Sequence, residues 1–306
     1  MTIIHHAISE PTSALEPFLA IPDLDLEHRS PTGMTMLLTA CARASSHSAG
    51  IKVSIKNSTL INHFIDRGAD VFAIDNKGRG ALHHLIESSK RAESHELLQT
   101  LAENNPALIH VRDNEGYTPL HYTLRSKMWN AARLLANAGA DLLDNDPQGN
   151  TALHWLSCTS KGPQHELFVS CISLGISINS RNNAGLTPLA TFLSTIDFLK
   201  DRSYDEDDSS WISKTLTIFE DVFVRNGADL LSKDNEGKGL LHIIAKQVAA
   251  DDQVPPEGIK NLQEMFRVLV AKGLDPWMED EGQMTPLDVA AVCGNDAILK
   301  MFRRDK

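Results

Sequence analysis

Short apolar runs at helical spacing recur along this chain, and a polar turn separates each pair of runs from the next. In the segment 113–121, Asp113 and Gly116 are suited to close a tight turn, because a short carboxylate caps backbone N–H groups and glycine accepts a positive φ. Thr118 is placed to cap a helix whose first position is Pro119. The pattern predicts a turn followed by two antiparallel helices, the second of which ends at a glycine.

The same unit recurs at a regular interval. Its central apolar residue is Leu120 in the segment above, and its counterparts are Ile4, Leu37, Leu82, Leu153, Leu189, Leu241 and Leu287. The shortest spacing between neighbours is 33 residues, and the longer spacings indicate insertions into a unit of that length. Such a unit cannot bury its own apolar face, so the pattern predicts an array in which stacked neighbours share one continuous core.

Two recurring strings resemble those of a known repeat. Thr-Pro-Leu-His at 118–121 returns with changes at 151–154, 187–190 and 285–288, and Gly-Ala-Asp closes units at 68–70, 139–141 and 227–229. With the turn and the second helix, these strings resemble the ankyrin repeat over nearly the whole chain. The resemblance implies an all-α solenoid of about seven to eight stacked helix-turn-helix repeats, whose turns project as a row of β-turn fingers.

The repeat pattern predicts a single domain over residues 1–306, because a solenoid has one core at any length. We expect an N-terminal capping half-repeat, a run of repeats and a C-terminal capping repeat, at 1–29, 30–277 and 278–306. Extra residues between first and second helices indicate insertions near 43–56, 196–213 and 247–259.

Composition and charge narrow the classes of partner. The chain has 306 residues, of which 42% are hydrophobic, and its net charge is −11. An acidic balance argues against nucleic acid and against anionic membrane surfaces. We find no apolar run of the roughly 20 residues that a membrane span needs, and no signal peptide. Four scattered cysteines at no metal or disulfide spacing suit a reducing compartment, so we expect a cytoplasmic or nuclear protein.

The resemblance also implies a binding surface, because ankyrin proteins bind other proteins with the fingers and the first helices of their concave side. Carried over residue by residue, the partner-binding positions are Asn76, Lys77, Arg79, Asn114, Glu115, Tyr117, Arg125, Ser126, Gln148, Asn150, Thr159, Asn183 and Leu186. Tyr117 and Arg125 belong to the residue types that interfaces favour as anchors.

We therefore expect a non-enzymatic scaffold or adaptor for partner proteins. Phosphate loops, dinucleotide-binding turns, zinc spacings and a recognisable nucleophile context are all missing from the sequence. The acidic run 205–208 lacks the spaced ligands and central glycine of a calcium loop. We accordingly expect no catalytic residue, metal or cofactor, and a monomeric chain.

Thirteen histidines invite other interpretations. Those in the repeated string have, in the family, the task of hydrogen bonding to the backbone: His83, His121, His154 and His242. His84, Tyr122 and Trp155 occupy one equivalent position in successive repeats. They are expected to stack as core, but a polar aromatic row can also line a pocket. The alternative function is therefore a small-molecule binder or enzyme, with its site at this row or under the insertion loops.

Overall fold

The computed structural model describes residues 21, 24–43, 57–88, 93–158, 165–196, 211–247 and 256–302. These residues form helices joined by turns and loops, and no strand occurs among them. The chain divides into two compact units, Met1–Leu142 and Leu143–Lys306, which we call unit 1 and unit 2. No membrane-crossing helix is present in the described ranges, since none there is both long and apolar enough.

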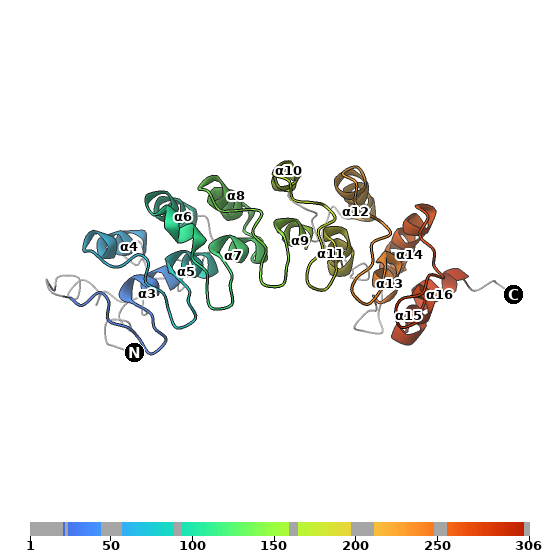
Figure 1. Ribbon diagram of the computed structural model, residues 1–306, viewed down its shortest axis with the longest axis horizontal. Helices are drawn as coiled ribbons and strands as arrows, with labels where there is room; N and C mark the ends of the chain where they lie inside the picture. Colours follow the sequence, from blue (N-terminus) through green and yellow to red (C-terminus); the bar gives the residue numbers. More distant parts are fainter. Residues whose placement is uncertain are drawn as a thin grey trace. The chain divides into compact units, whose positions relative to one another are not determined.

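Unit 1 is built from pairs of helices. In chain order they are α3 (Met36–Ala42), α4 (Asn57–Asp66), α5 (Ala81–Ser88), α6 (Glu93–Asn104), α7 (Pro119–Arg125) and α8 (Trp129–Asn137), with a 3-10 turn, η1 (Pro106–His110), after α6. The first helices α3, α5 and α7 pack on one another in sequence, and α6 packs on α8. Figure 1 shows the first helices of unit 1 as one row and the second helices as another.

Unit 2 repeats this arrangement. Its helices are α9 (Ala152–Ser157), α10 (His165–Ser173), α11 (Pro188–Thr195), α12 (Trp211–Ile218), α13 (Leu240–Ala245), α14 (Pro256–Ala271), α15 (Pro286–Cys293) and α16 (Asp296–Phe302), and a π-helical turn, η3 (Phe219–Val224), extends α12. The first helices α9, α11, α13 and α15 pack in sequence, as Figure 1 shows for this unit. Both units therefore have the helical repeat architecture that the sequence predicts.

The helix ends follow the predicted chemistry. Thr187 caps α11 by accepting a hydrogen bond from the Ala190 N–H at 3.3 Å, with Pro188 in the first helical position. Gly68 and Gly139, which follow the second helices of two repeats, have φ values of 87° and 102°. This left-handed conformation is accessible to glycine without steric cost, so the helices end where the Gly-Ala-Asp strings begin.

The core lies between the two rows of helices within each unit. Every residue of α7 from Pro119 to Leu124 is buried, and within unit 1 the helix packs against α5, α8 and η1. The second helices are buried along one stripe, as predicted for Leu97, Leu98 and Leu101 of α6, which are 5%, 2% and 2% exposed. Their polar faces remain in solvent.

Several predicted features fall mainly outside the described residues. They include most of the N-terminal capping half-repeat at 1–29, and the central parts of the insertions near 43–56, 196–213 and 247–259. The insertion near 247–259 ends within a helix, because α14 begins at Pro256. The single domain over 1–306 stays a prediction.

Candidate functional site

Each finger loop is closed by a side-chain oxygen of its first residue, which is a carboxylate oxygen in five of the seven loops. We use this name for residues 30–34, 75–79 and 113–117 of unit 1 and for residues 146–150, 182–186, 234–238 and 280–284 of unit 2. Asp113 is 8% exposed, and its Oδ1 accepts hydrogen bonds from the N–H groups of Glu115 at 3.0 Å and Tyr117 at 2.9 Å. Asn182 does the same with its side-chain oxygen in its own loop. The first oxygen therefore holds each loop in a tight turn.

Within each unit, asparagines link several finger loops to the preceding one, at positions 76, 114, 183 and 235. In unit 1 the Asn114 main-chain N–H donates to Lys77 O at 2.8 Å, and its side-chain amide donates to Asn76 O at 3.0 Å. In unit 2, Asn183 makes the same two contacts with Gln148 O and Pro147 O, at 2.9 and 3.0 Å. The amides of Asn76, Asn114 and Asn183, predicted to bind a partner, thus have a structural task.

This link between neighbouring loops also explains why the fourth residue of a finger loop, such as Gly78, is a glycine. Gly78 has a φ of 76°, and a Cβ at that position would lie 2.5 Å from Asn114 Oδ1. The close approach of the next asparagine therefore excludes any side chain there. The sequence reasoning missed the structural role of these asparagines, although their recurrence at one position of the turn was a signal that could have shown it.

The histidines of the repeated string hold consecutive repeats together, as predicted. His154 Nδ1 accepts a hydrogen bond from the Thr151 N–H at 3.1 Å, and its Nε2 lies 2.9 Å from Leu186 O in the next finger loop. His83 and His242 make the equivalent contacts with Tyr117 O and Met284 O, at 3.2 and 3.0 Å. Burial lowers the pKa of His83 and of His154, which fits neutral rings that accept at Nδ1 and donate at Nε2.

The row of His84, Tyr122 and Trp155 faces the second oxygen of the finger carboxylates. Tyr122 Oη donates to Asp113 Oδ2 at 2.7 Å, and Trp155 Nε1 donates to Asp146 Oδ2 at 3.0 Å. His84 Nε2 lies 3.2 Å from Asp75 Oδ2, without the alignment of a hydrogen bond. These side chains therefore support the finger loop of their own repeat.

His84 makes unit 1 sensitive to acid. Burial and the positive charge of Arg79 lower its pKa from 6.5 to about 4, although Asp75 acts in the opposite direction. Because the folded pKa is lower than the unfolded one, the unfolded chain takes up the proton first as the pH falls. Stability is therefore complete above about pH 6.5 and is lost progressively towards pH 4.

We expect His84→Gln to flatten this pH dependence, because glutamine stays neutral over the whole pH range. Between pH 7 and pH 5, His84 alone should account for a loss of about 2 kcal/mol in the free energy of unfolding. Urea unfolding of both proteins at the two pH values measures the difference. Equal losses in wild type and variant would show that His84 does not carry the effect.

Arg125 is the most distinctive polar group on the first-helix side of unit 1. It is exposed at the end of α7, and its guanidinium carbon lies 5.3 Å from the centre of the Tyr117 ring and 4.7 Å from that of Tyr122. Among the described residues it has no carboxylate partner in a salt bridge. Two aromatic rings therefore orient a cation that is free to bind an acceptor from outside.

Tyr117 differs from its prediction. We expected it at a finger tip, open to a partner, but it is 8% exposed. Its ring packs edge-on to those of His121 and Tyr122, at centroid distances of 6.1 and 6.3 Å, and lies under Arg125. The last position of the finger loop thus faces the core, and Tyr117 supports the guanidinium instead of offering its own surface.

The other predicted positions fall into two groups. Lys77, Glu115, Ser126 and Gln148 are exposed. The side chains of Arg79, Asn150 and Leu186 are half-buried, and the first two are committed to contacts. Arg79 binds the Asp75 and Glu87 carboxylates at 2.8 and 2.7 Å. Asn150 donates to Asp146 at 2.9 Å. Thr159 lies outside the described residues.

Two of the four cysteine thiols are buried. Burial raises the pKa of the Cys41 and Cys171 thiols to about 12, so neither is a thiolate near neutral pH. Within the described ranges, no three His, Cys, Asp or Glu side chains are grouped so that they could hold a metal ion. The acidic run 205–208 lies outside those ranges.

Comparisons with known proteins agree with this geometry. A family model described as ankyrin repeats (3 copies) matches residues 50–146 and 85–182. The ankyrin repeat protein OPG189 of Variola virus is 29% identical over 56% of this chain and 35% of its own length. The B-cell lymphoma 3 protein homolog of Mus musculus is 26% identical over 71% of this chain and 49% of its own length. The chain therefore spans less than half the length of either relative.

A solved structure has the same fold. The ankyrin repeat domain of Bcl-3, described as a unique member of the IkappaB protein family, matches with a TM-score of 0.53 and 20% sequence identity. The match covers 88% of this chain and 98% of that domain. Stacked repeats of this kind form protein-interaction domains. With its turns, paired helices and inter-repeat histidines, the chain has the ankyrin-repeat fold, and its residues 50–182 belong to the ankyrin-repeat family.

Proposed function

We propose that this chain is a non-enzymatic scaffold or adaptor that binds partner proteins with its finger loops and first helices. In unit 1 the contact residues would be Lys77, Glu115, Arg125 and Ser126, all of which are exposed. In unit 2 they would include Gln148, Asn183 and Leu186. We keep the expectation of a monomeric, cytoplasmic or nuclear protein, which the four free cysteines suit.

The observation that carries the proposal is the position of Arg125. Its guanidinium is exposed, unpaired by any described carboxylate and held over two tyrosine rings. Because the rings limit its freedom before binding, less conformational entropy is lost when a partner carboxylate or carbonyl docks on it. Arginines in such settings are common among the few residues that dominate the energy of an interface.

The finger loops give this surface rigidity. The carboxylate of Asp75 accepts two main-chain hydrogen bonds within its loop, and the loop is tied to its neighbour through Asn114. Loops fixed in this way present Lys77 and Glu115 in one arrangement. Rigid presentation favours affinity because little ordering remains to be done on binding.

Arg125→Ala should weaken capture of the principal protein partner. We expect the dissociation constant to rise about tenfold or more, because a truncated hot-spot arginine costs above about 1.4 kcal/mol. The partner is identified by affinity capture from native extract and mass spectrometry, and its affinity is then measured by titration with the full chain.

Arg133→Ala is the matched control for this test. Arg133 is an exposed arginine of the second helix α8 in the same unit, and its replacement should leave the affinity unchanged. Equal affinity of the wild type and the Arg125→Ala variant, with the same circular dichroism spectrum, would contradict the proposed surface.

Among the described residues, nothing favours the alternative of a small-molecule site at the row of His84, Tyr122 and Trp155; most of the insertion loops lie outside the described ranges. His84 and Tyr122 are 3% and 5% exposed, and their polar atoms face the finger carboxylates of unit 1. A hollow in unit 2 has a volume of about 30 Å³, whereas ligand pockets usually measure about 300 Å³ or more.

A further inference from the structure

Unit 2 exposes a group of large apolar side chains near its last repeats. Leu231, Trp277, Met278 and Phe302 are 67%, 61%, 41% and 37% exposed, and we call these four residues the apolar patch. Single exposed apolar residues are common on protein surfaces, but groups of them mark sites of interaction. The patch is built from residues other than those of the proposed finger surface.

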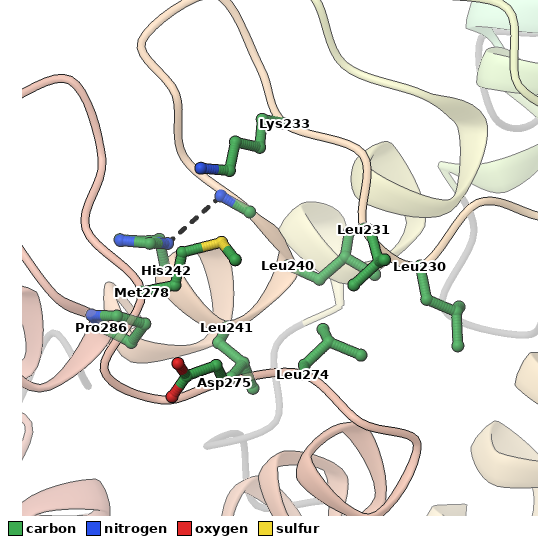
Figure 2. A pocket seen from close by; sticks show the side chains of 11 residues that line it. Leu230, Leu231, Lys233, Leu240, Leu241, His242, Leu274, Asp275, Met278 and Pro286 are labelled. Atoms are coloured by element: carbon green, nitrogen blue, oxygen red, sulfur yellow. Dashed lines mark hydrogen bonds between the residues drawn. The ribbon is translucent and has the colours of Figure 1, made fainter.

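Half of the patch surrounds a small hollow. Leu231 and Met278 line it together with Leu240, Leu274 and Pro286. Figure 2 shows Leu231 on one side of the hollow and Met278 and Pro286 on the other. Its volume of about 30 Å³ is too small for a cofactor or drug-sized ligand, but it suits the tip of a single apolar side chain.

The other half of the patch consists of two aromatic side chains, Trp277 and Phe302, which pack on a buried aromatic ring. The Trp277 ring lies edge-on to that of Phe302, with centroids 6.0 Å apart, and Phe302 in turn packs on the buried Phe266 at 5.9 Å. Trp277 is next to the hollow in sequence, because it immediately precedes Met278, which lines the hollow. A tryptophan that is exposed yet supported by other rings loses little freedom when it is covered.

The fold does not require apolar residues at these positions. Leu231 and Trp277 each lie four residues after the glycine that ends a second helix, and Asn179 occupies this position in an earlier repeat of unit 2. The Asn179 amide donates to Gly227 O at 2.9 Å, and its Oδ1 accepts from the Asp229 N–H at 2.8 Å. Leucine and tryptophan cannot make these bonds, and here they leave apolar surface in solvent instead.

Acidic side chains lie around the hollow end of the patch, whereas basic residues, Lys300, Arg303 and Arg304, flank Phe302 in the chain. Asp275 lines the hollow, Asp229 accepts a hydrogen bond from the Leu231 N–H, and Glu279 follows Met278 in the chain. All three are exposed, as is Glu281, whereas Lys233 is the one lysine or arginine among the residues that line the hollow. An apolar surface with a negative rim complements a segment whose apolar side chains are flanked by positive charge.

We propose that the apolar patch is a second docking site, which binds a partner segment carrying large apolar side chains flanked by lysine or arginine. One apolar side chain enters the hollow between Leu231 and Met278, and another covers Trp277. The basic residues face Asp229, Asp275 and Glu279. This site does not depend on Arg125, so a partner of the finger loops and a partner of the patch can bind together.

The test uses a phage-displayed library of random 15-residue peptides, selected on the full chain. The enriched peptides are synthesised and titrated against wild type and the double variant Leu231→Asn/Trp277→Asn by fluorescence anisotropy. We expect enrichment of leucine, phenylalanine or tryptophan next to lysine or arginine. The double variant should bind at least tenfold more weakly, and affinity for wild type should fall as salt is raised.

Three controls distinguish binding at the patch from unfolding and from binding elsewhere on the chain. The double variant should keep the wild-type melting temperature, because asparagine already occupies this position at residue 179. Leu174→Asn changes a residue that is 55% exposed and lies outside the patch, so it should leave binding unchanged. Arg125→Ala should also bind the peptides normally, even if it fails in the test of the finger surface.

Three outcomes would overturn the proposal. The first is a set of selected peptides that bind the double variant as well as wild type. The second is enrichment of acidic peptides, or of none at all. The third is sedimentation of the wild type as a dimer that the double variant abolishes, since a second copy of the chain would then be the occupant of the patch.

Discussion

Phe223→Ala is expected to lower the free energy of unfolding by about 3–5 kcal/mol, which is the usual cost of deleting a fully buried phenylalanine ring. Phe223 is 0% exposed and lies in the π-helical turn η3 of unit 2. Its ring contacts Phe168 of α10 and Phe192 of α11, at centroid distances of 5.6 and 5.0 Å. Its removal leaves a cavity between three helical segments that belong to two repeats.

Urea unfolding followed by far-ultraviolet circular dichroism measures this loss. Leu174→Ala, at a residue that is 55% exposed, is the control and should change the free energy by less than about 0.5 kcal/mol. A loss below about 1 kcal/mol for Phe223→Ala would contradict the close packing of Phe168 and Phe192 around its ring.

Asp113→Ala should destabilise unit 1 by about 2–4 kcal/mol, although no apolar contact is removed. The substitution leaves the N–H groups of Glu115 and Tyr117 without their acceptor and removes the 2.7 Å partner of the Tyr122 hydroxyl. Burial and the bond to Asp113 raise the pKa of Tyr122, so its hydroxyl stays protonated and needs an acceptor. Buried donors without acceptors carry their full desolvation cost.

Asp113→Asn is the matched variant, since asparagine closes the finger loop at residue 182 by the same two main-chain hydrogen bonds. We expect it to lose less than half as much stability as Asp113→Ala in the same urea titration. If both variants lost the same amount, the negative charge would matter and not the acceptor geometry.

The sequence was sufficient to predict the repeat, the helix starts and the role of the histidines. These features depend on local chemistry: Thr187 caps α11, Gly139 ends a second helix, and His154 bonds the main chain on both sides. Each of them recurs in register, so several weak local signals support one another.

The direction of individual side chains could not be predicted in the same way. Tyr117 was expected to face a partner, but the turn of its finger loop points the ring towards His121 and Tyr122. Asn114 was expected to be free for binding, but its amide is used by the neighbouring finger loop. The Asn114 contact joins residues far apart in sequence, and the direction of the Tyr117 ring depends on how the turn leads into α7. A linear pattern contains neither.

The exposed apolar residues illustrate a second limit. Leu231 and Trp277 belong to apolar strings, and a sequence pattern assigns such residues to the core. The geometry leaves them in solvent, because the loop after each second helix turns outward at this position. Asparagine at the equivalent position 179 shows that a polar residue fits there, but Phe72 and Leu143 occupy the same position in two other repeats and are 48% and 54% exposed.

Hydrogen–deuterium exchange of the full chain, with and without the principal captured partner, tests the proposed binding surface most directly. The proposed surface predicts protection of the finger loops 75–79 and 113–117 and of the residues around Arg125 at the end of α7. Protection confined to the second helices α4, α6 and α8, with those loops unchanged, would contradict it.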